Sequence, residues 1–384
     1  MFLRSDLDEL LACEQSPAIS IYLPTHKAGR EVRQDAIRLR NLLSAAAKRL
    51  GEQRRPPEIE ALIEPARKLI DDEEFWRYQD RGLAIFLAPG FRRIHKLAIE
   101  MPEELTIGKH FRIRPLLPIL DQTGWYWVLT ISAGRTRLCQ VSRWAIAEVG
   151  GLDLPQGIEE IFDETVYEGQ HYASPTGRPS RGPAGLAKAQ IFGEAPEELR
   201  KTQLIELLRR IAAAVEPVVK RRPAPVVLAA QPEIQGNFRE LAAWKELLPG
   251  GIQENPDAMA DDELRAKSWE LFEPSGEQSR TEALGRLHSL IGNGNGKTTT
   301  KPEEIVKAAR YGRVERLFLT PGTPLWGRFV EAEDRIVAHG TPGEGDEDLL
   351  DYAALMTLRQ GGEVTLVEPA EMPPGRPAAA ILRY

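Results

Sequence analysis

A helix pattern that ends at glycine and leads into a short apolar strand occurs twice in the last third of the sequence. The two runs are residues 302–311, Gly312 and 314–320, and residues 348–359, Gly361-Gly362 and 363–367. Glycine ends helices readily because it adopts positive φ without steric cost. With the apolar run that closes the chain at 378–384, the pattern predicts an α/β/α sandwich. The acidic, glycine-rich stretch 327–345 is expected to be a surface loop.

The first third of the chain has the pattern of a compact α+β domain. The expected elements are a strand at 18–24, helices at 31–50 and 58–74, strands near 82–87 and 94–99, and an alternating stretch at 111–114. The first helix is predicted from apolar residues at spacings of three and four. Proline at position 24 is expected to end the first strand.

The middle of the chain combines a hairpin, a helix and a strand that is apolar throughout. The expected elements are strands at 125–131, 136–141 and 226–230 and a helix at 197–219. Because 226–230 lacks alternation, we expect it to be buried on both faces, as in a mixed sheet. An extended loop over 165–195 is rich in Gly, Pro and Ser. Loops of this length in a compact domain are usually functional or disordered.

These elements divide the 384 residues into three expected domains, at 1–122, 123–258 and 259–384. A chain this long exceeds one ordinary domain of roughly 150 residues. Residues 251–384 hold 15 Lys and Arg against 23 Asp and Glu, an excess that accounts for the net charge of −7. If any part of the chain binds ribosomal RNA or tRNA, charge therefore favours the first two domains, and a protein partner is expected for the acidic third domain.

Composition and spacing exclude several classes of protein. No apolar run approaches the roughly 18 residues that span a bilayer, and the acidic start lacks a signal-peptide pattern, so we expect a cytoplasmic protein without membrane contact. Two cysteines and six histidines without metal-ligand spacing predict no metal and no cofactor. The stretch Gly292–Lys297 is similar to a phosphate-binding P-loop, but its first glycine is one position short. It is predicted to be a flexible loop.

Basic residues form three clusters in the first domain. The clusters are Lys27, Arg30, Arg33, Arg38 and Arg40; Arg92, Arg93 and Lys96; and Lys109, Arg112 and Arg114. One interpretation is an ordinary solvated surface. The other is a polarised face that suits an RNA phosphate backbone, because acids such as 71–74 balance these charges elsewhere. On the second interpretation we predict RNA contacts for Lys27, Arg30 and Arg33.

Several short motifs follow one another in a characteristic order. They are 19–26 with 38–43, 134–139, 168–170, 226–230 with 237–238, 308–318, and 357–364 with 378–384. In this order they resemble the bacterial branch of the archaeo-eukaryotic peptide-chain release factor family, over nearly the whole chain. The resemblance implies a multi-domain protein of α/β and α+β class. Its parts would be an α+β release-factor N-terminal domain, an RNase H-like mixed-sheet middle domain and an L7Ae-like α/β/α C-terminal domain.

The resemblance also implies a chemical role for residues 168–170. In the family, a Gly-Gly-Gln tripeptide enters the peptidyl-transferase centre and promotes hydrolysis of the peptidyl-tRNA ester. Gly169 and Gln170 match its second and third members, whereas Glu168 stands in place of the first glycine. Glycine allows close approach of the backbone to the ester, and Gln170 can orient water or stabilise the oxyanion. The family's codon-reading Asn-Ile-Lys-Ser motif is absent.

Two hypotheses of function follow. The first is a ribosome-associated, release-factor-like protein that acts on stalled or idle ribosomes without reading a codon. Its peptidyl-tRNA hydrolysis would depend on Gly169 and Gln170, and Arg178, Arg181 and Lys188 would contact RNA. The alternative, favoured by Glu168, is a non-catalytic protein that binds the ribosome or its tRNA site. A nuclease is disfavoured, because residues 123–250 contain no acid cluster with convincing spacing.

Overall fold

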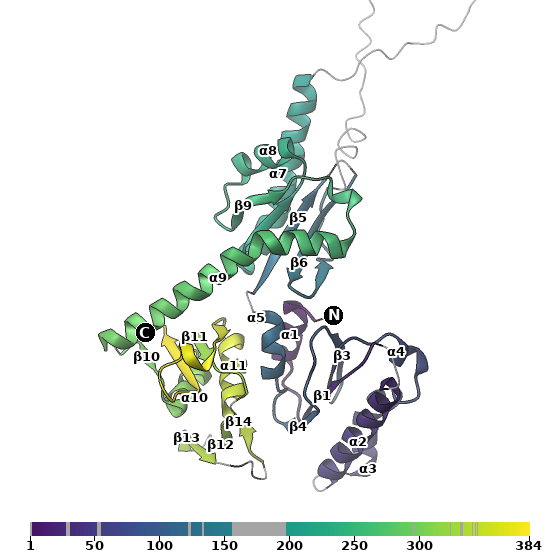
Figure 1. The fold of residues 1–384 in the computed structure, drawn as a ribbon, viewed down its shortest axis with the longest axis vertical. Helices are drawn as coiled ribbons and strands as arrows, with labels where there is room; N and C mark the ends of the chain where they lie inside the picture. Colours follow the sequence, from purple (N-terminus) through teal and green to yellow (C-terminus); the bar gives the residue numbers. More distant parts are fainter. Residues whose placement is uncertain are drawn as a thin grey trace, which may run out of the picture. The chain divides into compact units, whose positions relative to one another are not determined.

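The computed structural model describes most of the chain, in two compact units. The described residues are 2–27, 31–51, 55–121, 124–132, 134–155, 197–294, 296–322, 324–330, 333–339, 341, 343 and 345–384. Unit 1 contains residues 1–125, 140–147 and 272–384, and unit 2 contains 126–139 and 148–271 (Figure 1). Among the described helices, none has the length and apolar composition that a membrane span requires.

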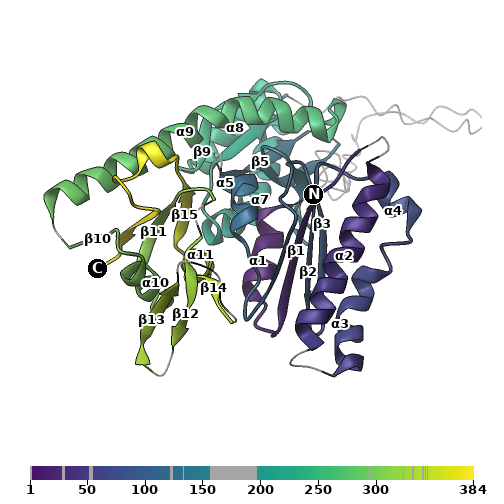
Figure 2. The same ribbon diagram turned by 60° about the horizontal axis from the view of Figure 1, so that its bottom comes forward.

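An antiparallel sheet of order β3-β2-β1-β4 forms the first part of unit 1. Its strands are β1 (Ala18–Pro24), β2 (Gly82–Ala88), β3 (Phe91–Leu97) and β4 (Glu104–Gly108). Helices α2 (Val32–Gly51) and α3 (Pro56–Arg67) lie side by side on one face (Figure 2). Alternate residues of β1, Ile19, Ile21 and Leu23, pack in this layer. Ala18 and Tyr22 face the opposite side, in a core shared with α1 (Arg4–Ala12).

The predicted elements of this region are largely confirmed, but helix α1 was not predicted, and three further corrections are needed. The helix expected at 58–74 is two helices, because α3 ends at Arg67 and Asp72 caps a new helix, α4 (Glu73–Arg77), through a 2.8 Å bond from the Phe75 amide. Strand β4 was not predicted. The alternating stretch 111–114 is not a strand and leads into the short helices η1 (Arg114–Leu116) and α5 (Leu117–Asp121).

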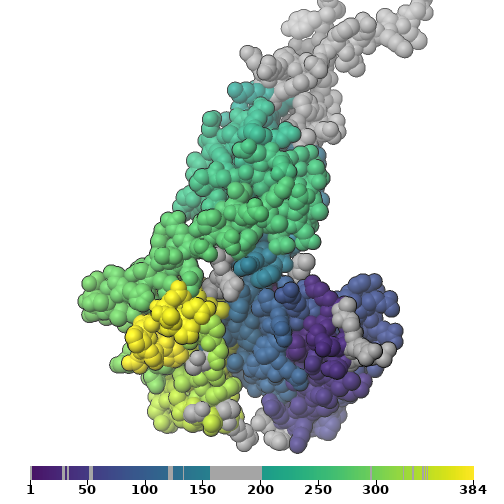
Figure 3. All heavy atoms as spheres, in the orientation of Figure 1, coloured from purple at the N-terminus to yellow at the C-terminus, as the bar shows by residue number. Residues whose placement is uncertain are grey.

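The last part of unit 1 is a three-layer sandwich, which confirms the α/β/α prediction. Its sheet has the order β10-β16-β11-β15, with β10 (Thr298–Thr299), β11 (Val314–Leu319), β15 (Glu363–Leu366) and β16 (Ala378–Leu382). Leu317 and Leu319 of β11 pack in the core that contains α10 (Pro302–Arg310) and α11 (Leu349–Arg359). Phe318 points the other way, to Leu287 of α9 (Asp261–Asn293). In Figure 3 the yellow C-terminal residues lie against green α9.

The stretch expected to be a surface loop contains a hairpin instead. Strands β12 (Trp326–Val330) and β13 (Arg335–His339) pair antiparallel, and β14 (Glu347–Asp348) joins β12 on its other side. Glycine suits this pairing at Gly327, because a Cβ there would lie 2.2 Å from the Val337 carbonyl oxygen. The prediction of a loop was therefore wrong, because it was based on the glycines and acidic residues of this region.

One apolar core joins the first and last parts of unit 1. It contains Leu7 of α1, Phe86 of β2 and Ile113, together with Ile305 of α10 and Leu350 of α11. The helices α1 and α11 are in direct contact. Domain boundaries at 122 and 258 stay a prediction, but residues on either side of the middle segment share this core.

Most of unit 2 is built on a sheet of order β7-β6-β5-β8-β9, although residues 140–147 at the end of β6 and in β7 count with unit 1. The strands are β5 (Trp125–Ile131), β6 (Thr136–Ser142), β7 (Ile146–Glu148), β8 (Val226–Ala229) and β9 (Leu247–Ile252). β8 is parallel to both β5 and β9 and is buried throughout, as its sequence predicted. Helix α7 (Glu197–Arg221) confirms the helix expected at 197–219. Helix α8 (Pro232–Ala242) and strand β9 were not predicted.

The glycines after α11 give a test of the helix–glycine–strand connection. A Cβ at Gly362 would lie 2.8 Å from the Val314 carbonyl oxygen and 3.1 Å from that of Glu315. Because backbone cannot yield easily, we expect Gly362→Ala to lower the free energy of unfolding by about 1–3 kcal/mol. Gly285→Ala, in α9 with open space around it, is the control and should raise stability by about 0.5–1 kcal/mol. Urea denaturation of both variants checks this, and equal effects would contradict it.

Candidate functional site

Most of the predicted site residues lie outside the described residues. The range 156–196 contains Glu168, Gly169, Gln170, Arg178, Arg181 and Lys188. Arg30 also lies outside, and only the backbone of Arg33 is described, within α2. Lys27 is described. The described part of this site therefore consists of the residues that flank the segment 156–196.

The segment 156–196 is attached to the sheet of unit 2. It follows β7 and precedes α7. The Val149 amide donates to the Leu138 carbonyl at 2.8 Å. The chain therefore remains hydrogen-bonded to β6 one residue beyond the end of β7. The turn between β5 and β6 is closed by Ser132, whose hydroxyl accepts from the Arg135 amide at 2.8 Å. This turn lies at the C-terminal end of β5, the edge at which parallel sheets usually bind ligands.

The C-terminal ends of β5 and β8 carry small and neutral side chains, Thr130, Ile131, Ser132, Ala229 and Ala230. Within the part of the chain that the structure describes, no three His, Cys, Asp or Glu side chains are grouped to hold a metal ion. Burial raises the pKa of the Cys139 thiol on β6 to about 12, so this thiol stays protonated and is a poor nucleophile at neutral pH.

Two arginines beside this turn are held by carboxylates. Arg135 donates to Glu148 at 2.6 Å, and Arg137 donates to Asp261 at 2.9 Å. Glu148 and Asp261 are 42 % and 61 % exposed. Arg135 is itself 52 % exposed, so its pair with Glu148 is weak and an RNA phosphate can compete for it. The Arg137 side chain is only 13 % exposed and is not accessible in this way.

Lys27, predicted to contact RNA, is on the surface. Its ammonium lies 2.9 Å from Asp80 and is 67 % exposed, so the pair holds it weakly. Arg38 differs from Lys27, because it donates at 3.0 Å to the buried carboxylate of Asp35. The same carboxylate accepts from the His26 backbone at 2.9 Å. Within this predicted cluster, Arg38 thus has a structural role and Lys27 is available to a ligand.

Arg112 and Arg114 are not part of a basic surface. Their side chains are only 12 % and 7 % exposed, and both lie beside the fully buried carboxylate of Asp348, at 3.3 and 3.0 Å. Arg114 also donates to the Thr320 carbonyl at 2.6 Å. From the sequence they were expected in a solvated or RNA-facing cluster. That interpretation is wrong, because their charges are neutralised inside unit 1.

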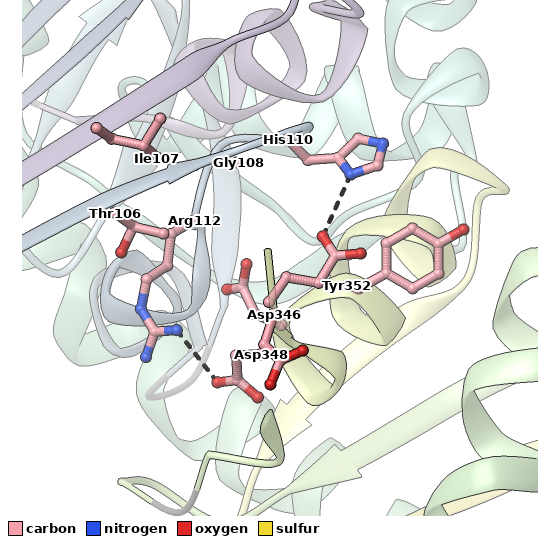
Figure 4. Close-up of a pocket in the computed structure, with 10 residues that line it drawn as sticks. Thr106, Ile107, Gly108, His110, Arg112, Asp346, Asp348 and Tyr352 are labelled. Carbon is pink, nitrogen blue, oxygen red and sulfur yellow. Dashed lines mark hydrogen bonds and ion pairs between the residues drawn. The ribbon is translucent and has the colours of Figure 1, made fainter. Parts of the chain in front are cut away.

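Both arginines form ion pairs at the N-terminus of α11. Asp348 is the N-cap of α11, and its second oxygen accepts from the amides of Leu350 and Leu325 at 3.1 and 3.0 Å. Asp351, in the first turn, accepts from the backbone amides of Ile113 and Arg114 at 3.0 and 2.6 Å. Figure 4 shows Arg112 pointing to Asp348. We name Arg112, Arg114, Asp348 and Asp351 the buried ion cluster.

A small cavity lies beside the buried ion cluster, between β4 and the start of α11. Its lining includes Thr106, His110, Arg112, Asp348 and Tyr352 (Figure 4). The volume of about 20 Å³ is enough for one water molecule. It is too small for a substrate, so the buried ion cluster is a structural junction and not an active site. The position of Asp348 at the start of the last long helix could be read from the sequence. Its arginine partners could not, because they are more than 230 residues away along the chain.

Burial raises the pKa of the Asp351 carboxyl to about 7, against the opposing effect of Arg112 and with an added contribution from Asp348. At neutral pH this group therefore exchanges a proton while it accepts the two backbone bonds from the first part of unit 1. Burial also raises the pKa of Tyr22, whose hydroxyl donates to the Arg112 carbonyl at 2.5 Å. The junction thus contains both fixed and titrating groups.

Comparison with known proteins supports the resemblance seen in the sequence. Residues 125–313 match the model of bacterial archaeo-eukaryotic release factor family 3. No curated protein sequence is similar to the chain. Among solved structures, an archaeal translation termination factor, aRF1, is 12% identical, with 100% of this chain and 99% of that chain covered and a TM-score of 0.25.

Two further structures are similar over part of the chain. A ribosome-bound archaeal Pelota, in a complex with ABCE1, is 14% identical, with 76% and 72% of the two chains covered and a TM-score of 0.38. Dom34 of S. cerevisiae, a translation termination-like factor that interacts with Hbs1, is 11% identical, with 79% and 73% covered and a TM-score of 0.34.

The buried ion cluster predicts a large loss of stability when one partner is removed. Arg114→Ala leaves the buried Asp348 carboxylate without its closest cation, and we expect the free energy of unfolding to fall by about 3–5 kcal/mol. Lys27→Ala removes an exposed pair and should cost less than about 1 kcal/mol. Urea denaturation measures both. Equal small losses would show that the junction contributes little.

Asp351 predicts a specific dependence of stability on pH. An unfolded aspartate has a pKa of about 3.9, and the folded-state pKa is raised to about 7. Between these values the folded protein retains a proton that the unfolded chain releases, so the free energy of unfolding falls as pH rises from about 4 to 7. Asp351→Asn should remove this contribution.

Denaturation midpoints of the native protein and of Asp351→Asn between pH 4.5 and 8 measure the difference. Asp71→Asn, at a carboxylate that is 90 % exposed, is the matched control and should follow the native profile. Parallel profiles for the native protein and Asp351→Asn would refute the assignment.

Proposed function

Since residues 125–313 match bacterial archaeo-eukaryotic release factor family 3, we propose that this release-factor-like protein acts on stalled or idle ribosomes in the cytoplasm without reading a codon. Gly169 and Gln170 form the tip that acts on the peptidyl-tRNA ester. The observation that carries the proposal is that the matched range contains both the sheet of unit 2 and residues 168–170.

The sheet of unit 2 supports the RNase H-like prediction for the middle domain. The strands β7, β6 and β5 are neighbours that follow one another along the chain, and β8 and β9 then extend the other side of β5 in parallel. Helices α7 and α8 precede and follow β8. The three layers around β11 and β16 support the L7Ae-like prediction in the same way. Both assignments remain predictions.

The chemistry of the tip requires close approach to an ester. Gly169 lets the backbone come near the ester carbonyl. The Gln170 amide can donate to the developing oxyanion or orient the attacking water, and loss of one such donor costs about 10²–10³-fold in rate. Glu168 brings a carboxylate close to tRNA phosphates, so in a working tip it must point away from the ester.

Action without a codon rests on the sequence of the first domain. The helices α2 and α3 are joined by residues 52–55, Glu-Gln-Arg-Arg, and the chain has no Asn-Ile-Lys-Ser tetrapeptide. RNA is held instead by basic side chains, namely Arg178, Arg181 and Lys188 near the tip and Lys27, Arg30 and Arg33 in the first domain. The exposed position of Lys27 supports this assignment. The net negative charge of residues 251–384 favours a protein partner for this part of the chain.

A second candidate is a binding protein without catalysis. Glu168 favours it, because a negative charge at the first position of the tripeptide repels both the phosphates and the oxyanion of the reaction. In this case the protein occupies the tRNA site of the ribosome through the same basic residues, and neither Gly169 nor Gln170 affects hydrolysis.

Peptide release separates the two candidates. The assay measures labelled peptide released from ribosomes that carry peptidyl-tRNA and an empty A site. For a working tip, Gln170→Ala should lower release by about 10- to 1000-fold, and Glu168→Gly should raise it or leave it unchanged. Arg178→Glu with Arg181→Glu should weaken co-sedimentation with ribosomes in either case. No release above background at saturating occupancy would leave only the binding protein.

A further inference from the structure

The solvent-facing side of α7 carries an excess of positive charge. Between residues 201 and 221, α7 has five Lys and Arg and two Glu. Arg209 is 65 % exposed and Lys220 is 73 % exposed. The whole chain has a net charge of −7, so this excess runs against the overall composition. A polyanion is the partner that such a surface attracts.

Ion pairs within the helix do not neutralise this surface. Glu206 lies 3.7 Å from the guanidinium groups of both Arg209 and Arg210, and Glu216 lies 2.8 Å from Lys220. Pairs of this kind on an exposed helix contribute only about 0.3–0.5 kcal/mol. Arg221 is exposed and has no ion pair with any residue in the described ranges. Two carboxylates thus face four cations.

The positive surface also continues past the end of α7. Arg222 follows the helix, and its carbonyl accepts from the Trp127 indole at 3.2 Å, which fixes it beside β5. Lys245, 90 % exposed, precedes β9, and the neighbouring Glu246 carbonyl accepts from the first residue of β8 at 2.7 Å. Cations in the last turn of a helix are explained by its dipole. Arg209, Arg210 and Lys245 need another explanation.

Two pairs of cations lie on one side of α7. Arg209 and Lys220 are eleven residues apart, which in a regular helix is about 16 Å along the axis with directions about 20° apart; Pro217 lies between them. The opposite side of α7 is fixed in the core by Leu207, Leu208 and Ile211, each fully buried. We name Arg209, Arg210, Lys220 and Arg221 the α7 cationic face.

The α7 cationic face has no group that could stack on a base. Helix α7 contains no aromatic residue, whereas proteins that bind single strands combine basic grooves with aromatic platforms. Fixed cations without aromatic residues suit phosphates at the regular positions of a double helix, which proteins recognise by shape.

We propose that the α7 cationic face binds the phosphate backbone of double-helical RNA, namely the stem of the tRNA whose ester Gln170 approaches. The identity of this stem rests on the proposed function. α7 begins directly after the segment 156–196 that contains the tripeptide. A stem held along α7 would thus be bound by the element that follows the tip in the chain.

The test measures binding of labelled tRNA to the full-length protein, without ribosomes, over a range of salt concentrations. The variants are Arg209→Gln with Arg210→Gln, and Lys220→Gln with Arg221→Gln. Each should weaken tRNA binding by about 3- to 10-fold at low salt and reduce the slope of log affinity against log salt by about 1–2. Arg67→Gln with Lys68→Gln is the matched control, since these are exposed cations of α3 with helical carboxylate partners.

Native affinity and salt slope in both α7 variants would overturn the proposal. An equal loss in the α3 control, or an equal effect on an unstructured single-stranded RNA of the same length, would overturn it as well. The proposed catalysis is judged separately by peptide release. If the native protein releases no peptide but the α7 variants bind tRNA more weakly, the proposed catalysis is wrong and the α7 cationic face is supported. If the protein releases peptide but the α7 variants bind tRNA normally, only the proposal for the α7 cationic face is wrong.

Discussion

Unit 1 depends on the burial of two arginine charges beside Asp348. Removing a charge from water costs several kcal/mol, and only a close partner with further hydrogen bonds repays it. Asp348 provides that partner at 3.0 and 3.3 Å while it also caps α11, and Asp351 fixes the backbone at Ile113 and Arg114. The apolar core shared by α1, β2, α10 and α11 lies in the same unit. Residues 1–125 and 272–384 are therefore held together by both this junction and the shared core.

The same physics separates structural cations from functional ones. Arg38, Arg112 and Arg114 are held by carboxylates that are completely buried, and they are not available to a ligand. Lys27, Arg209 and Lys220 have partly exposed partners, and a phosphate can displace these. Whether a basic cluster can bind RNA depends on how deeply the partner carboxylate is buried. A count of charges along the sequence does not give this burial.

In the proposed function, the described residues of unit 2 position the tip and do not react themselves. They include no cluster of three His, Cys, Asp or Glu side chains that could hold a metal ion, and the Cys139 thiol stays protonated. In the proposed function, the residues that flank the tip supply position and charge. The proposed reaction then depends on the backbone at Gly169, the Gln170 amide and the bound RNA. A tip of the proposed kind needs little reactive chemistry of its own, because a donor that stabilises the developing oxyanion lowers the barrier to attack by water.

Local patterns in the sequence determined much of the fold. Glycine after a helix, the apolar run at β8 and the period of α2 and α7 predicted those elements correctly, because propensity and burial act there over a few neighbouring residues. The hairpin of β12 and β13 and the full length of α9 escaped prediction. The buried residues of α9 face unit 2 near Leu264 and unit 1 near Leu287, so no single apolar stripe marks it. The tripeptide at 168–170 stays a prediction, and the sequence did not indicate the role of Arg112 and Arg114. Their buried partners lie more than 230 residues away, and only the tertiary structure brings such charges together and removes them from water.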